Sequence, residues 1–385
     1  MIRALLLVLI GCGRIGFDEQ SGGPPVLPVE TDVPGFTTTS STFVEVPGST
    51  VTLPPSPGTR WLILVSGSLL SASFKEIGVE ARYLIDGIER GIGGTQANQL
   101  DRPGPWQHFC LHEGTDTPAQ ITVELRDGTG AAAVIEDLRI VAVPLPAGAE
   151  GLYAAADPEQ VVMTPTFEPL VTLTVNPTTP GEYVFLLLAN TSDAPSRSDI
   201  HTQWRAPDGQ YWTSDLHMPR SAWQSHLFVR RTTLGAGPAS LVFEVNATGS
   251  QARFSYVRAL ALRVDGFPSF EVAQDATLRS TTSSASTVTN RLDPIGGARQ
   301  FLYLAAVLMR ADCTNTSPAD RGIHLSIDGN TESFRHVTEN CSYETTYGAA
   351  HLLPRRPAQL EVGFSSGNAE IVVYQESSLL LIGLD

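Results

Sequence analysis

The chain lacks long hydrophobic runs and contains little cysteine and lysine. After the N-terminus no apolar run approaches the roughly 20 residues that a membrane-spanning helix requires. Four cysteines are present, and a single lysine, Lys75, stands beside 24 arginines. The sequence also has no zinc signature, no Gly-x-Ser-x-Gly turn and no glycine-rich phosphate loop. These absences exclude a transmembrane helix and the commonest catalytic motifs, and we expect no catalytic residue, no metal and no cofactor.

Acidic residues outnumber basic ones, 40 against 25, so that the formal net charge is −15. Nucleic-acid binding draws most of its affinity from Lys and Arg side chains that neutralise phosphates. The charge therefore argues against a nucleic-acid partner, and equally against adsorption to an anionic lipid surface.

The first twelve residues form a compact pattern. Arg3 carries their one positive charge, Ala4 to Ile10 are apolar, and the segment ends in Leu9-Ile10-Gly11-Cys12. An apolar run of this length suits a signal peptide and cannot span a bilayer. The pattern resembles the signal peptide and lipobox of bacterial lipoproteins. The alternative is an ordinary secretory signal followed by an unrelated cysteine.

The resemblance implies cleavage before Cys12, a diacylglyceryl group on its thiol and an acyl group on its new amine. Two or more acyl chains hold a protein firmly on a membrane. Gly13 follows Cys12, where an Asp would imply retention in the inner membrane, so an outer-membrane lipoprotein is expected. Residues 12–35 contain Gly22-Gly23-Pro24-Pro25 and few apolar residues, and this composition predicts a flexible tether.

The remainder of the chain repeats itself three times. Three features recur in the same order with similar spacing: an aromatic residue that begins an apolar strand, an Asp-Gly pair and a Pro-Ala pair. They begin at Trp61, Tyr183 and Phe301, at Asp86, Asp208 and Asp328, and at Pro118, Pro238 and Pro357. A period of about 120 residues is right for tandem domains. We therefore predict domains at 36–146, 147–266 and 267–385.

Each repeat is predicted to be all-β. Apolar and polar residues alternate after each Pro-Ala pair, which is typical of half-buried antiparallel strands, and Asp-Gly favours a tight hairpin. Seven or eight short strands in each repeat indicate a β-sandwich, either a jelly roll or an immunoglobulin-like fold. We prefer the jelly roll, because the long intervals between the recurring features indicate crossovers between sheets. The short, proline-containing links then predict a semi-rigid rod of three domains.

Three cysteines remain if Cys12 is lipidated. Cys313 and Cys341 both belong to the third repeat, and in an oxidising compartment we expect them to form a disulfide. Cys110 has apolar neighbours and is expected to be a buried free thiol.

Histidines and tryptophans are expected to serve the fold. His108, His226 and His351 are predicted to occupy matching places, as are Trp106, Trp223 and Tyr343. Residues that recur in this way indicate core packing rather than one active site. A turn at Arg126–Gly130 could offer a calcium ligand, although an ordinary surface turn is the preferred interpretation because it lacks the ladder of Asp and Asn of a calcium loop.

Aromatic residues of the second repeat are the one local signal for binding. Trp204, Tyr211 and Trp212 surround the Asp208-Gly209 turn, and exposed aromatic rings can stack on sugars. Tyr211 and Trp212 are adjacent, so on a strand only one of the two can face inward. These three residues are the candidate glycan-binding site.

The sequence thus predicts an outer-membrane lipoprotein with three β-sandwich domains that acts as a non-enzymatic structural or interaction module, on the periplasmic or the external side. Its expected partners are the membrane, through Cys12, and either a glycan or another envelope protein. The alternatives are a carbohydrate-binding surface protein and, less favoured, an envelope hydrolase.

Overall fold

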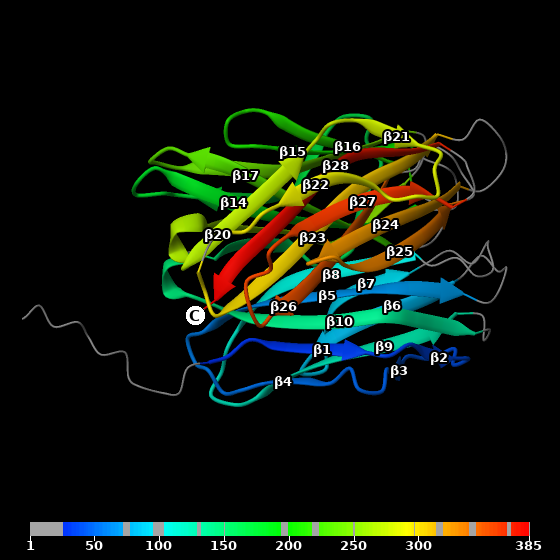
Figure 1. Ribbon diagram of the computed structural model, residues 1–385, viewed down its shortest axis with the longest axis horizontal. Helices are drawn as coiled ribbons and strands as arrows, with labels where there is room; N and C mark the ends of the chain where they lie inside the picture. Colours follow the sequence, from blue (N-terminus) through cyan, green and yellow to red (C-terminus); the bar gives the residue numbers. More distant parts are fainter. Residues whose placement is uncertain are drawn as a thin grey trace, which may run out of the picture.

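The computed structural model describes residues 26–71, 78–94, 104–128, 132–149, 151–193, 199–217, 223–248, 251–295, 297–312, 319–338, 344–367 and 371–384. Antiparallel strands dominate these residues and form six sheets, two in each of three domains (Figure 1). The predicted all-β class is confirmed.

The first domain consists of two sheets. One has the strand order β1-β10-β5-β8, and β2 also pairs with β10; in the other, of order β9-β6-β7, β3 and β4 both pair with β9. This is the strand order of a jelly roll, because the first and last strands are neighbours and each sheet alternates early and late strands. The strands are β1 (Val29–Val33), β2 (Phe36–Thr38), β3 (Val44–Glu45), β4 (Val51–Leu53), β5 (Arg60–Ser71), β6 (Val79–Ile85), β7 (Ile88–Gly94), β8 (Gly104–Glu113), β9 (Ala119–Asp127) and β10 (Ala133–Leu145).

The second domain repeats this order. Its sheets are β11-β19-β14-β17, in which β12 also pairs with β19, and β13-β18-β15-β16. It follows a short 3-10 helix, η1 (Ala147–Ala149). Its strands are β11 (Leu152–Ala156), β12 (Gln160–Val162), β13 (Glu168–Val175), β14 (Gly181–Asp193), β15 (Asp199–Arg205), β16 (Tyr211–His217), β17 (Gln224–Leu234), β18 (Ala239–Thr248) and β19 (Ala252–Arg263).

The third domain has the same order again, β20-β28-β23-β26, with β21 on β28, and β22-β27-β24-β25. A second 3-10 helix, η2 (Val264–Gly266), precedes it. Its strands are β20 (Ser269–Asp275), β21 (Arg279–Thr281), β22 (Thr287–Leu292), β23 (Gln300–Asp312), β24 (Ala319–Ile327), β25 (Asn330–Thr338), β26 (Glu344–Leu353), β27 (Leu360–Ser366) and β28 (Ile371–Leu384).

The tether ends earlier than the sequence predicts. Strand β1 (Val29–Val33) pairs with β10, where Val29 lies opposite Ala142 and Val33 opposite Leu138. These residues are therefore part of the first sandwich. The prediction of a spacer through Gly35 is therefore wrong for its last residues.

The Asp-Gly pairs form the predicted hairpins. In the first and third domains both residues have positive φ, 51° and 76° at Asp86-Gly87 and 52° and 82° at Asp328-Gly329, which is the geometry of a type I′ turn. In the second domain only Gly209 has a positive φ, and the turn is longer.

The three domains form a closed ring, and the predicted rod is wrong. Sheets β1-β10-β5-β8, β11-β19-β14-β17 and β20-β28-β23-β26 each have a second apolar face, and these faces meet in one shared core. From the central strands it includes Leu62, Leu64, Val184, Leu186, Leu188, Leu302 and Leu304. The ring surrounds a pseudo-threefold axis and is stabilised by burial of these side chains.

The strands nearest the axis are β8, β17 and β26. Their ladders place Gln107 opposite Ser66, Leu227 opposite Leu188 and Gly348 opposite Ala306. These three partners stand at the same sequence separation from the aromatic residues that mark the repeats, Trp61, Tyr183 and Phe301. Gln107, Leu227 and Gly348 are therefore equivalent, and they touch one another at the axis: a Cβ on Gly348 would lie within 2.8 Å of atoms of both other residues.

The same ladders correct the expected matches. His108 pairs with Val65, His226 with Ala189 and His351 with Tyr303, which are three different register positions. The prediction that the three histidines occupy matching places is therefore wrong, because counting along the sequence misplaced the register; all three are nevertheless buried. Trp106 lies opposite Gly67, and its equivalents in register are His226 and Tyr347. Trp223 lies before the start of β17. The prediction that Trp106, Trp223 and Tyr343 match is therefore also wrong.

The ring has two different ends. At one, which we call the linker end, β1 begins, β28 ends, and η1 and η2 join the domains (left in Figure 1). The two links contact each other closely, since a Cβ on Gly266 would lie 2.3 Å from the carbonyl oxygen of Gly148. At the opposite, far end lie the strand ends that flank the β5–β6, β7–β8 and β9–β10 connections and their counterparts in the other domains.

Candidate functional site

The three aromatic candidates occupy different environments. Trp204 is buried in the core of the second domain, with its ring centroid 4.5 Å from that of Phe243. Trp212 lies opposite Trp204 on the next strand and is partly exposed. Tyr211 is 55 % exposed. The structure thus leaves Trp204 unavailable to a ligand and places Tyr211 and Trp212 at or near the surface.

Trp212 lies near the contact between the second and third domains. Its ring is 6.2 Å from that of Phe185, and the guanidinium of Arg230 lies 5.8 Å from its centroid. Arg230 in turn donates to Glu376 of the third domain at 2.6 Å. An aromatic ring beside a guanidinium and a carboxylate can contact the faces and hydroxyls of a sugar.

A buried arginine joins the first and second domains. Arg258 is completely buried on β19, and its Nη1 donates to the Tyr83 hydroxyl at 2.7 Å and to the Phe109 carbonyl at 2.6 Å. Its Nη2 lies 2.8 Å from Asp157, which balances the charge. These contacts fill the open edge of the first sandwich with a side chain from the second.

A second arginine joins the first and third domains. Arg139 lies on β10, and its Nη1 approaches His351 Nε2 at 2.6 Å and Glu332 at 3.5 Å. Glu30 and Asp32 lie at 3.4 and 3.2 Å from the same guanidinium. Burial raises the pKa of Glu30, whereas the hydrogen bond with His351 lowers that of Glu332.

The cluster around Arg258 contains Cys110 and His108. Cys110 is a buried free thiol, and burial raises its pKa. Burial also lowers the pKa of His108 to about 3, and its Nε2 contacts the carbonyl of Ile92 at 3.0 Å. A thiol whose pKa is raised is a poor nucleophile, so the cluster acts in packing.

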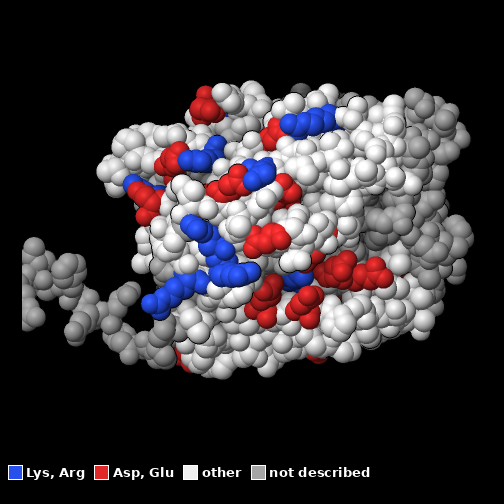
Figure 2. Space-filling model, in the orientation of Figure 1, with Lys and Arg blue, Asp and Glu red and all other residues white. Residues whose placement is uncertain are grey.

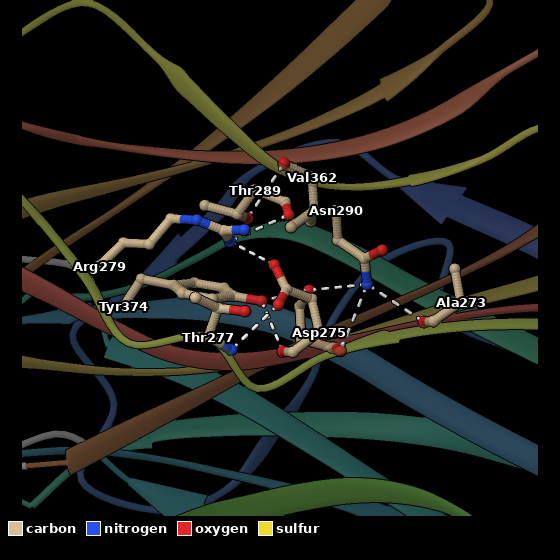
Figure 3. A network of polar contacts seen from close by, with 9 residues as sticks. Ala273, Asp275, Thr277, Arg279, Thr289, Asn290, Val362 and Tyr374 are labelled. Atoms are coloured by element: carbon tan, nitrogen blue, oxygen red, sulfur yellow. Dashed lines mark hydrogen bonds and ion pairs between the residues drawn. The ribbon is translucent and has the colours of Figure 1, made fainter.

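Figure 3 shows a polar network at the outer edge of the third domain. Asp275 accepts from the Thr277 amide at 2.9 Å and from Arg279, which also donates to the Thr289 carbonyl at 3.1 Å. Tyr374 donates to the Asp275 carbonyl at 2.8 Å. Burial alone would raise the pKa of Asp275, but the hydrogen bonds from Thr277 and Arg279 lower it. These groups satisfy one another, so the network closes the edge of the sandwich.

Some predicted site residues lie in parts of the chain that are not described. Cys12, Cys313, Cys341 and Tyr343 lie outside the described residues. Asp127, of the turn at Arg126–Gly130, is buried, and its amide donates to the Ser40 carbonyl at 2.9 Å. Within the described part of the chain, no group of three or more His, Cys, Asp or Glu side chains could hold a metal ion.

Charges of both signs are present on the visible face. Arginines and carboxylates lie side by side over its left and centre (Figure 2), in agreement with ion pairs such as Arg231–Glu182 and Arg291–Asp293. No helix among the described residues is long and apolar enough to cross a membrane.

Sequence reasoning missed the arginines between the domains. Arg258 stands in the run Tyr256-Val257-Arg258-Ala259-Leu260, and a charge inside an otherwise apolar strand was the available signal. A buried charge requires a partner, but the sequence could not show that the partners come from another domain.

Comparison with known proteins gives structural similarity only. No family model and no curated protein matches this chain. A triple jelly-roll turret protein of an archaeal virus is similar over 93 % of this chain and 91 % of its own, with 9 % identity and a TM-score of 0.22. Tandem CBM22 domains of Xyn10C from Paenibacillus barcinonensis match 62 % of this chain and 96 % of their own, at 8 % identity and a TM-score of 0.20. PNGF-II matches 84 % and 99 %, at 6 % identity and a TM-score of 0.25. Similarities this low carry no argument about function, and the chain stands as a protein of three jelly-roll domains.

Proposed function

We propose that the protein is a lipid-anchored protein of the bacterial outer membrane, whose three-domain ring acts as a non-enzymatic interaction module. The observation that supports this proposal most directly is the polarity of the ring. The chain enters β1 at the linker end, and the strand ends that flank the β5–β6 and β7–β8 connections, with their counterparts in the other domains, lie at the far end (Figure 1). An anchor on Cys12 would therefore hold the linker end towards the membrane and present the far end to a partner.

The rigidity of the ring favours the same function. Loops that bind partners are commonly carried on a rigid scaffold, and the shared core together with Arg139 and Arg258 fixes the three domains relative to one another. Partner-binding loops of three domains would act as one surface.

Metabolic labelling with radioactive palmitate tests the anchor. We expect label in the wild-type chain and none in Cys12→Ser, and the wild-type chain should fractionate with outer membranes. Unlabelled wild-type protein, or equal labelling of Cys12→Ser, would refute the anchor. Protease treatment of intact cells then distinguishes the periplasmic from the external face.

The second candidate function is carbohydrate binding by the second domain. It is favoured by the exposed ring of Tyr211 next to Trp212, which the Arg230–Glu376 pair adjoins. On a glycan array of the purified chain, Tyr211→Ala should lose a signal that the exposed hairpin control Ile88→Ala keeps. A wild-type chain that binds no polysaccharide would eliminate this candidate.

A further inference from the structure

Four large apolar side chains at the linker end are exposed to solvent. They are Leu27 (65 % exposed), Ile88 (58 %), Tyr211 (55 %) and Ile295 (85 %). They come from all three domains: the approach to β1, the β6–β7 turn, the start of β16 and the β22–β23 connection. The linker end thus exposes large apolar side chains from each of the three domains.

The loop that carries Ile295 is held in place. Its amide donates to both carboxylate oxygens of Glu271, at 2.9 and 3.1 Å, and its carbonyl accepts from Arg356 at 3.0 Å. Because the backbone is fixed on both sides, the loop holds the isoleucine side chain out into solvent. Arg299, Arg355 and Arg356, all exposed, belong to this loop or to the neighbouring turn.

Ile88 is presented in a similar way. It follows the type I′ turn at Asp86-Gly87, and the Asp86 carboxylate accepts from the Gln120 amide at 2.8 Å. The turn is thereby tied to the start of β9. Two backbone segments from different domains, each held by hydrogen bonds, thus expose isoleucines at the same end.

We propose that the linker end is a lipid-docking surface, which rests on the membrane that holds Cys12. An apolar loop tip next to arginines matches the bilayer interface, where apolar groups enter the acyl boundary and guanidinium groups stay at the phosphates. The identity of this membrane depends on the function proposed above.

The chain before β1 identifies the occupant as lipid. Fourteen residues separate the start of the mature chain at Cys12 from Val26, the first described residue. An unstructured chain of this length would have a mean end-to-end distance of about 20 Å, and the described chain begins next to β1 at the linker end. An acyl chain on Cys12 would therefore keep Ile88 and Ile295 within reach of the bilayer surface.

The acidic net charge restricts the kind of lipid. With residues 1–11 removed, the loss of Arg3 changes the formal charge from −15 to −16, which disfavours strongly anionic vesicles. Burial of isoleucine at an interface needs no opposite charge, so zwitterionic phosphatidylcholine is the suitable probe.

The test uses added tryptophans as depth sensors. The mature chain carries Cys12→Ser and an N-terminal hexahistidine, which holds it on phosphatidylcholine vesicles that contain a nickel-chelating lipid. Ile88→Trp and Ile295→Trp are compared with Val288→Trp, whose parent residue is 53 % exposed on β22, away from the linker end. Vesicles with brominated acyl chains quench only tryptophans that enter the bilayer.

We expect loss of most of the added fluorescence, with a blue shift, for Ile88→Trp and Ile295→Trp, and neither effect for Val288→Trp. Unquenched emission at 88 and 295, or equal quenching at 288, would overturn the proposal. A blue shift that grows with protein concentration without vesicles would assign the surface to a second copy of the chain instead. Because nickel lipid supplies the attachment, this result does not depend on acylation of Cys12, which palmitate labelling tests separately.

Discussion

Gly348→Ala should destabilise the protein by crowding the pseudo-threefold axis. A Cβ at this position would lie 2.3 Å from Gln107 Oε1 and 2.8 Å from Leu227 Cδ2, and these two atoms belong to the other two domains. Gln107 cannot move away freely, because its Nε2 donates to the carbonyl and the hydroxyl of Thr346 at 3.1 and 2.8 Å. The added methyl group must therefore displace a hydrogen-bonded side chain or separate the domains.

The expected cost follows from these contacts. Overpacking a core costs about 1–3 kcal/mol, and each hydrogen bond lost from Gln107 adds about 1 kcal/mol. We therefore expect Gly348→Ala to lower the free energy of unfolding by roughly 2–4 kcal/mol in urea titrations. Gly297→Ala is the control, since a Cβ there would meet no atom within 4 Å, and its effect should stay within about 0.5 kcal/mol.

A double substitution tests the cause. Gln107→Ala removes the atom that the new methyl group meets, so Gly348→Ala with Gln107→Ala should cost at least about 1 kcal/mol less than the two single changes together. If Gly348→Ala were as mild as Gly297→Ala, the three domains would not meet at this residue. The closed ring would then be refuted.

Three further predictions concern buried polar groups. Arg258→Met should lower the free energy of unfolding by about 3–5 kcal/mol, because it leaves the buried Tyr83 hydroxyl and Phe109 carbonyl without their donor and Asp157 without its cation. Arg60→Met at the surface should cost less than about 1 kcal/mol; similar losses in urea titrations would contradict the buried contact. Burial lowers the pKa of His226 to about 3, and the unfolded chain takes up a proton below about pH 6.5, so this histidine should lower stability by about 1.4 kcal/mol per pH unit as the pH falls from 6.5 towards 3. His226→Leu should therefore reduce the loss of stability between pH 7.5 and pH 5, and an unchanged loss would be the contrary result. Cys313 follows β23 and Cys341 precedes β26, two strands that pair with each other, and in an oxidising compartment the two cysteines are predicted to form a disulfide; non-reducing peptide mapping should recover them linked, and two free thiols would refute the pairing.

The fold of each domain was predictable because its signals are local. Alternation after each Pro-Ala pair marks β9, β18 and β27, and the Asp-Gly pairs mark the hairpins. These features depend on neighbours within a few residues, so the sequence displays them directly.

The ring was not predicted, although its signal was present. In Trp61-Leu62-Ile63-Leu64-Val65 the odd-numbered residues face the core of the first domain, and Leu62 and Leu64 face the shared core. An uninterrupted apolar strand is typical of a sheet covered on both faces. The sequence could show that a second face needs cover, but the side chains that cover it come from other domains.

The candidate site was predictable only in part for the same reason. Adjacency on a strand correctly required that Tyr211 or Trp212 face outward, and Tyr211 is the more exposed. Trp204 lies opposite Trp212 in the neighbouring strand and is buried, which depends on the packing of two sheets. The neighbour of Trp212, Arg230, binds a carboxylate from the third domain, and no local pattern indicates such a contact.

The contacts between domains also explain why one chain forms one ring. Arg139, Arg258 and Ser378 are equivalent in register, as are Cys110, Arg230 and His351.

The first of these sets reaches into the neighbouring domain and meets a member of the second. Arg258 approaches the domain that carries Cys110, and Arg139 meets His351. Where the third domain meets the second, the residue equivalent to Arg139 and Arg258 is Ser378, which donates to the Val229 carbonyl. The guanidinium at this contact is that of Arg230, which donates to Glu376. A homotrimer of second domains would place the equivalent of Arg258, which is completely buried, against the partly buried Arg230, and two like charges in one such contact are unfavourable. The shared leucines bury the second face of each domain, and the position of the guanidinium distinguishes the contact between the second and third domains from the other two.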